Sequence, residues 1–265
     1  MAITIQSTIG TQNLINQTNK NQNTLQDTLR TLASGVKSNS SASYIALSDQ
    51  FTSQLRSLNQ STQNVNDGIA IAQVTNSGLS QIQDNFARLR ELAVQSANDT
   101  LTDADRQTIN QEAQQIQEQI NSIIQDTNYN GISVLASNAS VTLQTGASSS
   151  DQTIIQLQDL TGAFAPIDLS TQSSASTALD TLDTYAQQVQ QYQTDLGAVQ
   201  SGLESTLSTL NSTFESLTAA TSRIQDVNMA DQLTQLAAAN IRSQAGVAIL
   251  TQANQSAERV YSLLQ

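Results

Sequence analysis

The chain has 265 residues and a net charge of -12, and it contains neither cysteine nor histidine. Without them, the thiol nucleophile, the usual general base and most transition-metal ligands are missing, so we expect no enzyme, no metal and no cofactor. Aromatic residues make up only 3% and there is one proline, which favours long helices joined by thin aliphatic seams over a thick globular core.

Charge is unevenly distributed along the chain. Lysine and arginine are absent between residues 107 and 222, while aspartate and glutamate recur there. Nucleic acid and anionic membranes require clustered cations, and no stretch approaches the roughly 18 apolar residues of a membrane span. Residues 1–11 also lack the basic leader and apolar core of a signal peptide. Taken alone, these features predict a cytoplasmic protein, or export by machinery that reads a disordered leader.

Residues 1 to about 40 alternate polar runs with sparse apolar anchors. Ordering a residue costs about 1–2 kcal/mol of backbone entropy, and so few anchors offset little of it, so we expect this segment not to fold alone. The anchors are Ile3, Ile5, Ile9, Leu14, Leu25, Leu29, Leu32 and Val36.

Residues 44–96 carry a heptad pattern that predicts one long helix in need of a partner helix. Its apolar positions are Val65, Ala72, Leu79, Phe86 and Ala93, with Leu58, Ile69, Ile82 and Leu89 between them. After a break at residues 98–101, Thr102 is expected to cap a second helix that runs to about Asp126. The apolar stripe of that helix is Ile109, Ala113, Ile116, Ile120 and Ile123.

A short β-patterned segment at about 129–170 follows these helices. The pair Asn130-Gly131 predicts a turn, and alternation around Val141 and Ile155 predicts a β-hairpin. Residues 167–169 could add a third short strand, and the serine-rich run 170–177 is expected to end the segment.

Helical periodicity resumes at about residue 178 and continues past Arg223, with glycines at 197 and 202. This block and the 44–96 block each need a long partner. We therefore predict a mainly α fold, in which a long antiparallel helical hairpin or coiled-coil bundle carries a small β-hairpin region.

The last block, residues 229–265, mirrors the first. Its polar face is rich in Gln and Asn with few cations, which argues against a membrane-surface helix and favours burial against copies of the same chain. The predicted assembly seam runs through the last two blocks and comprises Leu203, Leu207, Leu210, Phe214, Leu217, Ile224, Leu233, Leu236, Ile241, Ile249, Leu263 and Leu264.

No catalytic constellation is visible in the sequence. Glu112 and Glu118 are six residues apart on a predicted helix, so they fall on different faces instead of converging as an acid/base pair. Serine and threonine are plentiful but have no histidine base.

Several short runs resemble bacterial flagellin. The most specific is RELAVQSAN at residues 90–98; the others are SG at 34–35, NDGI at 66–69, YNG at 129–131, LGA at 196–198, SRIQD at 222–226, QAG at 244–246 and QANQ at 252–255. These runs occur in the family's order and span about four-fifths of the chain.

The resemblance implies a structural subunit that polymerises with itself into the extracellular helical filament of the flagellum and supports swimming motility. It implies a terminal domain of residues 1–41 and 227–265, disordered in the monomer and ordered in the filament, and a middle domain of residues 42–226. It also implies that the large outer domains of longer relatives are absent. Further partners implied are the flagellar export apparatus, an export chaperone, the filament cap and hook-associated proteins, with export that leaves no cleaved signal peptide.

Two alternatives remain open at this stage. The hook–filament junction protein resembles flagellin at both ends, and a cytoplasmic coiled-coil adaptor would share the helical pattern. The sequence also departs from the family at residues 39–51, where paired aspartates and an alanine-glycine step are missing. We expect the link between terminal and middle domains to be remodelled there.

The resemblance further suggests recognition by a Toll-like innate immune receptor. Arg88, Leu92 and Glu112 occupy the matching positions on two adjoining helices, and Arg88 and Leu92, four residues apart, share one face. The alternative is that Leu92 belongs to the packing seam and Arg88 to a contact between subunits.

Overall fold

The computed structural model describes residues 2–37 and 42–263, without the side chains of residues 2–9, 11, 257, 260, 261 and 263. The helices are α1 (Ala2–Ser34), α2 (Ala42–Ser96), α3 (Asp103–Asp126), α4 (Gln172–Gln225) and α5 (Met229–Leu263). The strands are β1 (Asn128–Tyr129), β2 (Ile132–Ser133), β3 (Ser140–Gln144) and β4 (Gln152–Gln156). The mainly α fold with small two-stranded sheets is confirmed.

The chain divides into two compact units. We call residues 1–53 and 216–265 the terminal unit and residues 54–215 the middle unit. The sequence predicted boundaries at 41/42 and 226/227. In the structure the terminal unit extends to residue 53 and begins again at residue 216, so it includes the first turns of α2 and the last turns of α4. Of the altered link at 39–51, residues 39–41 lie outside the described ranges, and the rest begin α2.

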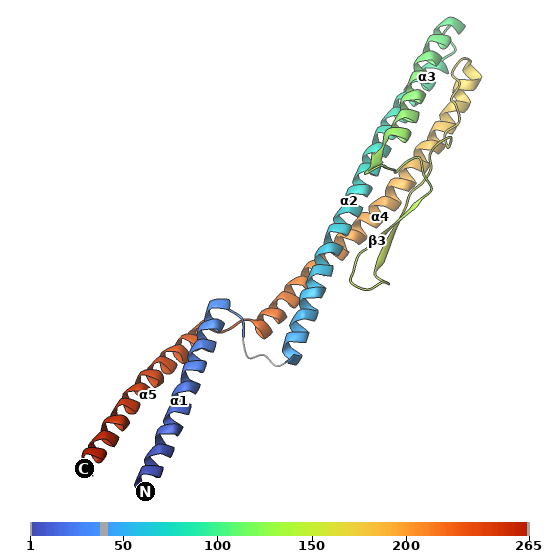
Figure 1. Cartoon of the computed structure of the whole chain (residues 1–265). Helices are drawn as coiled ribbons and strands as arrows, with labels where there is room; N and C mark the ends of the chain where they lie inside the picture. Colours follow the sequence, from blue (N-terminus) through green and yellow to red (C-terminus); the bar gives the residue numbers. More distant parts are fainter. Residues whose placement is uncertain (1, 38–41, 264–265) are drawn as a thin grey trace. The chain divides into compact units, whose positions relative to one another are not determined.

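In the terminal unit, α1 and α5 run antiparallel and side by side (Figure 1). Their inner faces bury small and hydroxylated side chains in place of large aliphatic ones, namely Thr18, Thr28, Thr31 and Ala239. The hydroxyls of Thr18 and Thr28 donate to carbonyls four residues earlier in α1, at 2.9 and 2.7 Å. Because the hydroxyls are satisfied locally, the threonine methyls are free to pack, and the two helices approach closely.

A short β-bridge ties the two chain segments of the terminal unit together. Gly35, with φ +70, ends α1 in the left-handed conformation that glycine adopts without strain. Val36 then pairs with Asp226. The Lys37 N–H donates to the Gln225 carbonyl at 3.0 Å, and the Val227 N–H donates to the Gly35 carbonyl at 3.1 Å.

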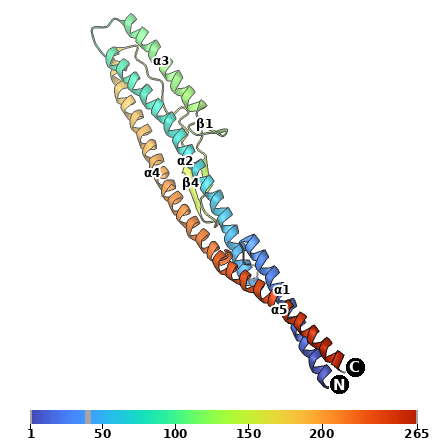
Figure 2. The same ribbon diagram turned by 90° about the vertical axis from the view of Figure 1, so that its left-hand side faces the viewer.

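In the middle unit, α2, α3 and α4 pack along one another (Figure 2). Gln193 of α4 bonds Ser80 of α2, and Asp183, earlier in α4, pairs with Arg90, later in α2, so the two long helices are antiparallel. The five predicted heptad positions of α2 between residues 65 and 93 are all buried. On α3 the last stripe position is Ile124, not Ile123, because buried positions recur every four residues from Ile116 onward.

Two antiparallel hairpins lie beside these helices. Asn130 and Gly131, both at positive φ, form the predicted turn and join β1 to β2. The longer hairpin pairs β3 with β4, with Val141 opposite Ile155. Leu143 and Ile155 are buried, so this hairpin presents its apolar side to the helices.

The third strand expected at residues 167–169 does not form. The segment is extended, but its backbone N–H groups find side chains on α3 instead of a strand: Ile167 donates to Gln117 Oε1 at 2.7 Å and Leu169 to Asn110 Oδ1 at 2.8 Å. Periodicity also placed the start of α4 too late. The Thr171 hydroxyl accepts from the Ser174 N–H and caps the helix, so the serine-rich run forms its first turn.

Among the described residues, no helix has the length and apolarity required to span a membrane. Within the same residues, no group of three or more Asp and Glu side chains is arranged to hold a metal ion.

Candidate assembly surface

Helix α5 exposes large apolar side chains along its length. Leu233 and Ile249 are each 52% exposed and Ile241 is 68% exposed, and Met229 and Val247 are about half exposed. Residues of this size are ordinarily buried in a soluble protein, and a group of them marks a surface that binds a partner.

These side chains lie on more than one face of α5. At 3.6 residues per turn, Ile241 projects about 200° around the helix from the buried Ala239, so it points away from α1. A helix that is apolar on one stripe needs one partner, whereas a helix that is apolar all round is buried on all sides. The pairing of α5 with α1 therefore covers only part of its apolar surface.

The structure distributes the predicted assembly seam among three environments. Leu203 and Leu210 are buried in the middle unit of their own chain, where they serve its core. Leu233, Ile241 and Ile249 are exposed. The half-buried members are Leu207, Phe214, Leu217, Ile224 and Leu236. The Leu263 side chain and the whole of Leu264 lie outside the described residues.

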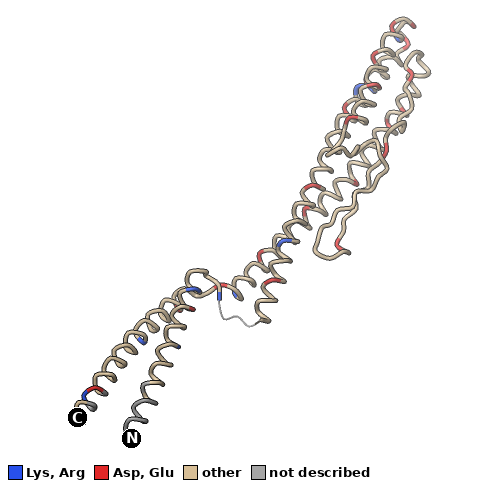
Figure 3. Tube along the Cα trace, in the orientation of Figure 1, with Lys and Arg blue, Asp and Glu red and all other residues tan. Residues whose placement is uncertain are grey.

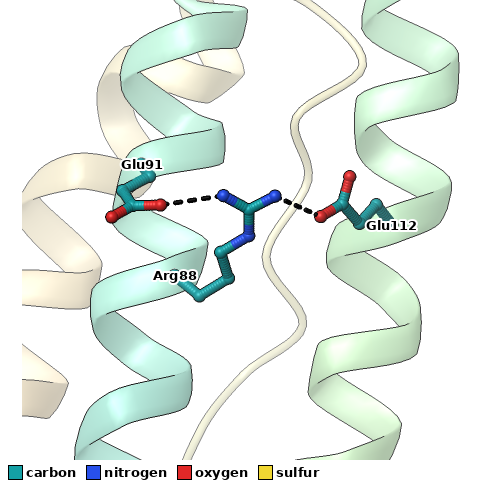
Figure 4. Close-up of polar contacts among 3 residues, drawn as sticks. All are labelled: Arg88, Glu91 and Glu112. Carbon is teal, nitrogen blue, oxygen red and sulfur yellow. Dashed lines mark hydrogen bonds and ion pairs between the residues drawn. The ribbon is translucent and has the colours of Figure 1, made fainter.

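Arg88 on α2 forms a charged cluster with two glutamates (Figure 4). Its guanidinium contacts Glu91 at 2.8 Å and Glu112 of α3 at 2.7 Å; the Arg88 and Glu112 side chains are about half exposed and that of Glu91 is 69% exposed. The hydrogen bonds that Arg88 donates, first to Glu91 and then to Glu112, raise the pKa of Arg88 above its ordinary value. Exposed ion pairs contribute little stability, so the cluster mainly fixes the direction of the Arg88 side chain.

Leu92 is only 1% exposed, although it lies one turn from Arg88. The structure thus brings Arg88 and Glu112 together at the surface and places Leu92 in the packing seam, as the alternative for that residue stated. Glu118 is not near this cluster. It lines a shallow groove between α2 and α3.

A buried arginine at the α2–α3 turn escaped the sequence analysis. Arg106 is 4% exposed, and its guanidinium donates to the Ser96 carbonyl and, at 3.2 Å, to the Leu101 carbonyl. The Ser96 hydroxyl donates in turn to the Leu169 carbonyl at 2.7 Å. A cation at the carboxyl end of a helix is favoured by the helix dipole, and here it fixes the turn.

Two tyrosines of α4 hold the irregular segment that follows β4. The Tyr192 hydroxyl accepts from the Gln158 N–H at 3.1 Å, and the Tyr185 hydroxyl accepts from the Ala165 N–H at 2.9 Å. Tyr185 also packs its ring against Phe164, with centroids 5.1 Å apart. The spacing of tyrosines along α4 was available in the sequence, but nothing in it named backbone N–H groups as their partners.

Two family models match this chain. The model of the bacterial flagellin N-terminal helical region matches residues 5–140, and that of the bacterial flagellin C-terminal helical region matches residues 179–264. Together they cover α2, α3 and α5 in full and most of α1 and α4. The segment between the two matches contains most of the β3–β4 hairpin and the start of α4.

Individual proteins show the same similarity over nearly full lengths. The chain is 35% identical over 254 residues to a flagellin of Halalkalibacterium halodurans, covering 92% of this chain and 93% of that protein. It is 30% identical over 302 residues to a flagellin of Bacillus subtilis, covering 98% and 99%. The crystal structure of Bacillus cereus flagellin matches with a TM-score of 0.52 and 25% identity, covering 56% of this chain and 88% of that one.

Proposed function

This chain belongs to the bacterial flagellin family, whose members are the subunits of the flagellar filament, and we propose that its terminal unit joins the copies by being buried among them. The protein is a structural, non-enzymatic subunit of an extracellular polymer. The chain is 30–35% identical to flagellins over nearly their full length, which favours the filament subunit over the junction protein and the cytoplasmic adaptor.

One observation carries the proposal for the terminal unit: α5 displays exposed Leu233, Ile241 and Ile249 on faces that α1 does not cover. Covering a half-exposed side chain of this size contributes on the order of 1 kcal/mol. Neighbouring copies in a polymer can cover all of these faces at once. Head-to-tail contacts that do not close into a ring then extend into an open helical filament.

The same surface accounts for coupling between order and assembly. Fixing some seventy terminal residues costs on the order of 70–140 kcal/mol of backbone entropy. The α1–α5 pair buries mainly threonine and small side chains between its helices, which offset little of that cost. We therefore infer that the ends are disordered in the free subunit and become helical as copies surround them.

Truncation tests this role. A chain that lacks residues 233–265 should retain a folded, soluble middle unit and form no filaments under conditions in which the full chain does so. Electron microscopy would score the filaments, and circular dichroism would verify that the middle unit is folded. Normal filaments from the truncated chain would refute the proposal.

Family membership supports a proposal for export and delivery. We propose that the subunit leaves the cell through the flagellar export apparatus with an export chaperone, and that the filament cap and hook-associated proteins guide its insertion. The signature would be filament protein whose amino terminus has not been cleaved. Mass spectrometry of sheared filaments measures this directly, and a mature protein shortened by a leader peptide would contradict it.

A second role is recognition of the monomer by a Toll-like receptor. Arg88 and Glu112 are exposed and held 2.7 Å apart, which gives a partner a fixed surface to read. The buried Leu92 would shape this surface from beneath without touching the receptor. Binding of the monomer to a receptor ectodomain should weaken in Arg88→Ala and remain in Arg30→Ala. Equal binding of the two variants would rule out the role.

A further inference from the structure

The two units differ sharply in charge. The terminal unit contains six cations and five carboxylates, whereas the middle unit contains four cations and 17 carboxylates. Along α2, α3 and α4, acidic residues are visibly more frequent than basic ones (Figure 3). A polymer brings many such acidic units together. A cation of one copy that contacts carboxylates of another therefore favours their packing.

Three of the four arginines of the middle unit are already engaged within their own copy. Arg88 contacts two glutamates, Arg90 contacts an aspartate on α4, and Arg106 is buried against backbone carbonyls. The fourth is Arg56, which is exposed on α2. Among the described residues, no carboxylate lies within ion-pair distance of it.

A groove between α2 and α3 has the complementary charge. It has a volume of about 780 Å³ and is lined by carboxylates, amides, a hydroxyl and one isoleucine: Gln81, Asp84, Asn85, Gln115, Glu118, Gln119, Ser122 and Ile123. Asp84 and Glu118 are both exposed, and neither forms an ion pair within the part of the chain that the structure describes. Carboxylate and amide oxygens together suit a guanidinium, which offers five donors.

Arg56 cannot reach this groove in its own copy. Arg56 and Asp84 lie on the same helix, α2, and at 1.5 Å per residue they are about 42 Å apart along its axis. An arginine side chain spans only a small fraction of that distance. A contact between them therefore requires two copies, with one displaced along the other.

We infer that Arg56 of one copy enters the α2–α3 groove of a neighbouring copy and binds Asp84 and Glu118. The contact uses different surfaces on the two copies, as an open polymer requires. The inference rests on the proposed filament function and adds a specific contact between middle units. The charges of the terminal unit nearly balance, so it has no charge excess comparable to that of the middle unit.

Charge reversal tests the contact. Arg56→Glu should raise the critical concentration for polymerisation about tenfold or more, because it removes an attraction and places a carboxylate against two others. Arg56→Lys should keep most of the assembly. The triple variant Arg56→Glu, Asp84→Arg, Glu118→Arg reverses both sides and should bring the critical concentration back toward that of the unmodified chain.

The controls separate this contact from folding and from the proposed function. Gln54→Glu adds a negative charge two residues away and should leave polymerisation unchanged, and circular dichroism should show equal helix content in every variant. Polymerisation of Arg56→Glu at the unmodified concentration, or a triple variant no better than Arg56→Glu, overturns the inference alone. An unmodified chain that forms no filaments overturns the proposed function, and this inference with it.

Discussion

Gly68 of α2 faces Leu203 of α4 so closely that a Cβ at Gly68 would lie 3.2 Å from the Leu203 Cδ1 atom, and it would also overlap Leu143 of β3. Gly197 and Gly202 of α4, by contrast, have no atom of another described side chain or helix within 4 Å of such a Cβ. Close packing thus explains the glycine on α2, while the two glycines on α4 have no such reason in this structure.

Alanine substitutions at these glycines should have opposite effects. Gly68→Ala should lower the free energy of unfolding of the middle unit by about 1–3 kcal/mol through overpacking. Gly197→Ala should raise it by roughly 0.5–1 kcal/mol, since alanine restricts the unfolded chain and nothing opposes its methyl group. Urea unfolding followed by circular dichroism measures both. A stabilising Gly68→Ala would show that β3 does not rest on α2 as described.

Removal of the buried cation should be costly. Arg106→Gln should destabilise the middle unit by about 3 kcal/mol, because the carbonyls of Ser96 and Leu101 lose charged donors in a buried site. Arg90→Gln is the matched control: its ion pair with Asp183 is half exposed, so its loss should cost less than about 1 kcal/mol. Similar unfolding midpoints for the two variants would contradict the structural role of Arg106.

Tyr192 should make the middle unit sensitive to alkali. Burial raises its pKa, against a smaller lowering by the Gln158 N–H. The neutral phenol is the form that the folded state favours, so its contribution is complete below the unfolded pKa of about 10 and is lost as the pH rises through the folded pKa. The free energy of unfolding should therefore fall above pH 10, and less steeply in Tyr192→Phe.

The phenylalanine variant should also be about 1 kcal/mol less stable at neutral pH, since the Gln158 N–H loses its acceptor. Tyr44→Phe, at an exposed tyrosine, should leave the neutral value unchanged. Urea midpoints measured from pH 7 to 11 provide the comparison. Parallel curves for Tyr192→Phe and the unmodified chain would be incompatible with a buried hydroxyl.

The exposed apolar surface of α5 should matter only in the polymer. Ile241→Ser should raise the critical concentration for assembly about tenfold, the equivalent of about 1–2 kcal/mol of lost burial, and should leave the melting of the middle unit unchanged. Ile154→Ser removes a similarly exposed side chain from β4 and should assemble normally. Sedimentation of polymer from monomer measures both, and an unaffected Ile241→Ser would remove this face from the assembly surface.

Periodicity was most reliable where one face of a long helix meets a partner. The five heptad positions of α2 between residues 65 and 93 are buried as predicted, although Ile69 between them is only half-buried, because a seven-residue repeat leaves little freedom in which face is covered. The same repeat continues on α4 through Leu182, Val189 and Leu196, which precede the first residue of the predicted seam, Leu203. Thr102 caps α3 as expected, and Asp105 returns its hydrogen bond.

Local patterns failed where long-range partners satisfy the backbone. Ile167 and Leu169 alternate like a strand, yet their N–H groups bond amide side chains of α3 some fifty residues earlier. A single sequence does not reveal such pairings. Likewise, the four-residue spacing of Arg88 and Leu92 suggested a shared surface, but α3 and the 158–170 segment decide which positions of α2 are covered.

The bridge between Val36 and Asp226 gives the two chain ends a common starting point. Helix α1 ends shortly before Val36, and helix α5 begins shortly after Asp226. Once this bridge has formed, each further contact between α1 and α5 closes only a short loop, which costs little further entropy. The pairing of α1 with α5 can therefore extend stepwise from the bridge toward the two chain ends.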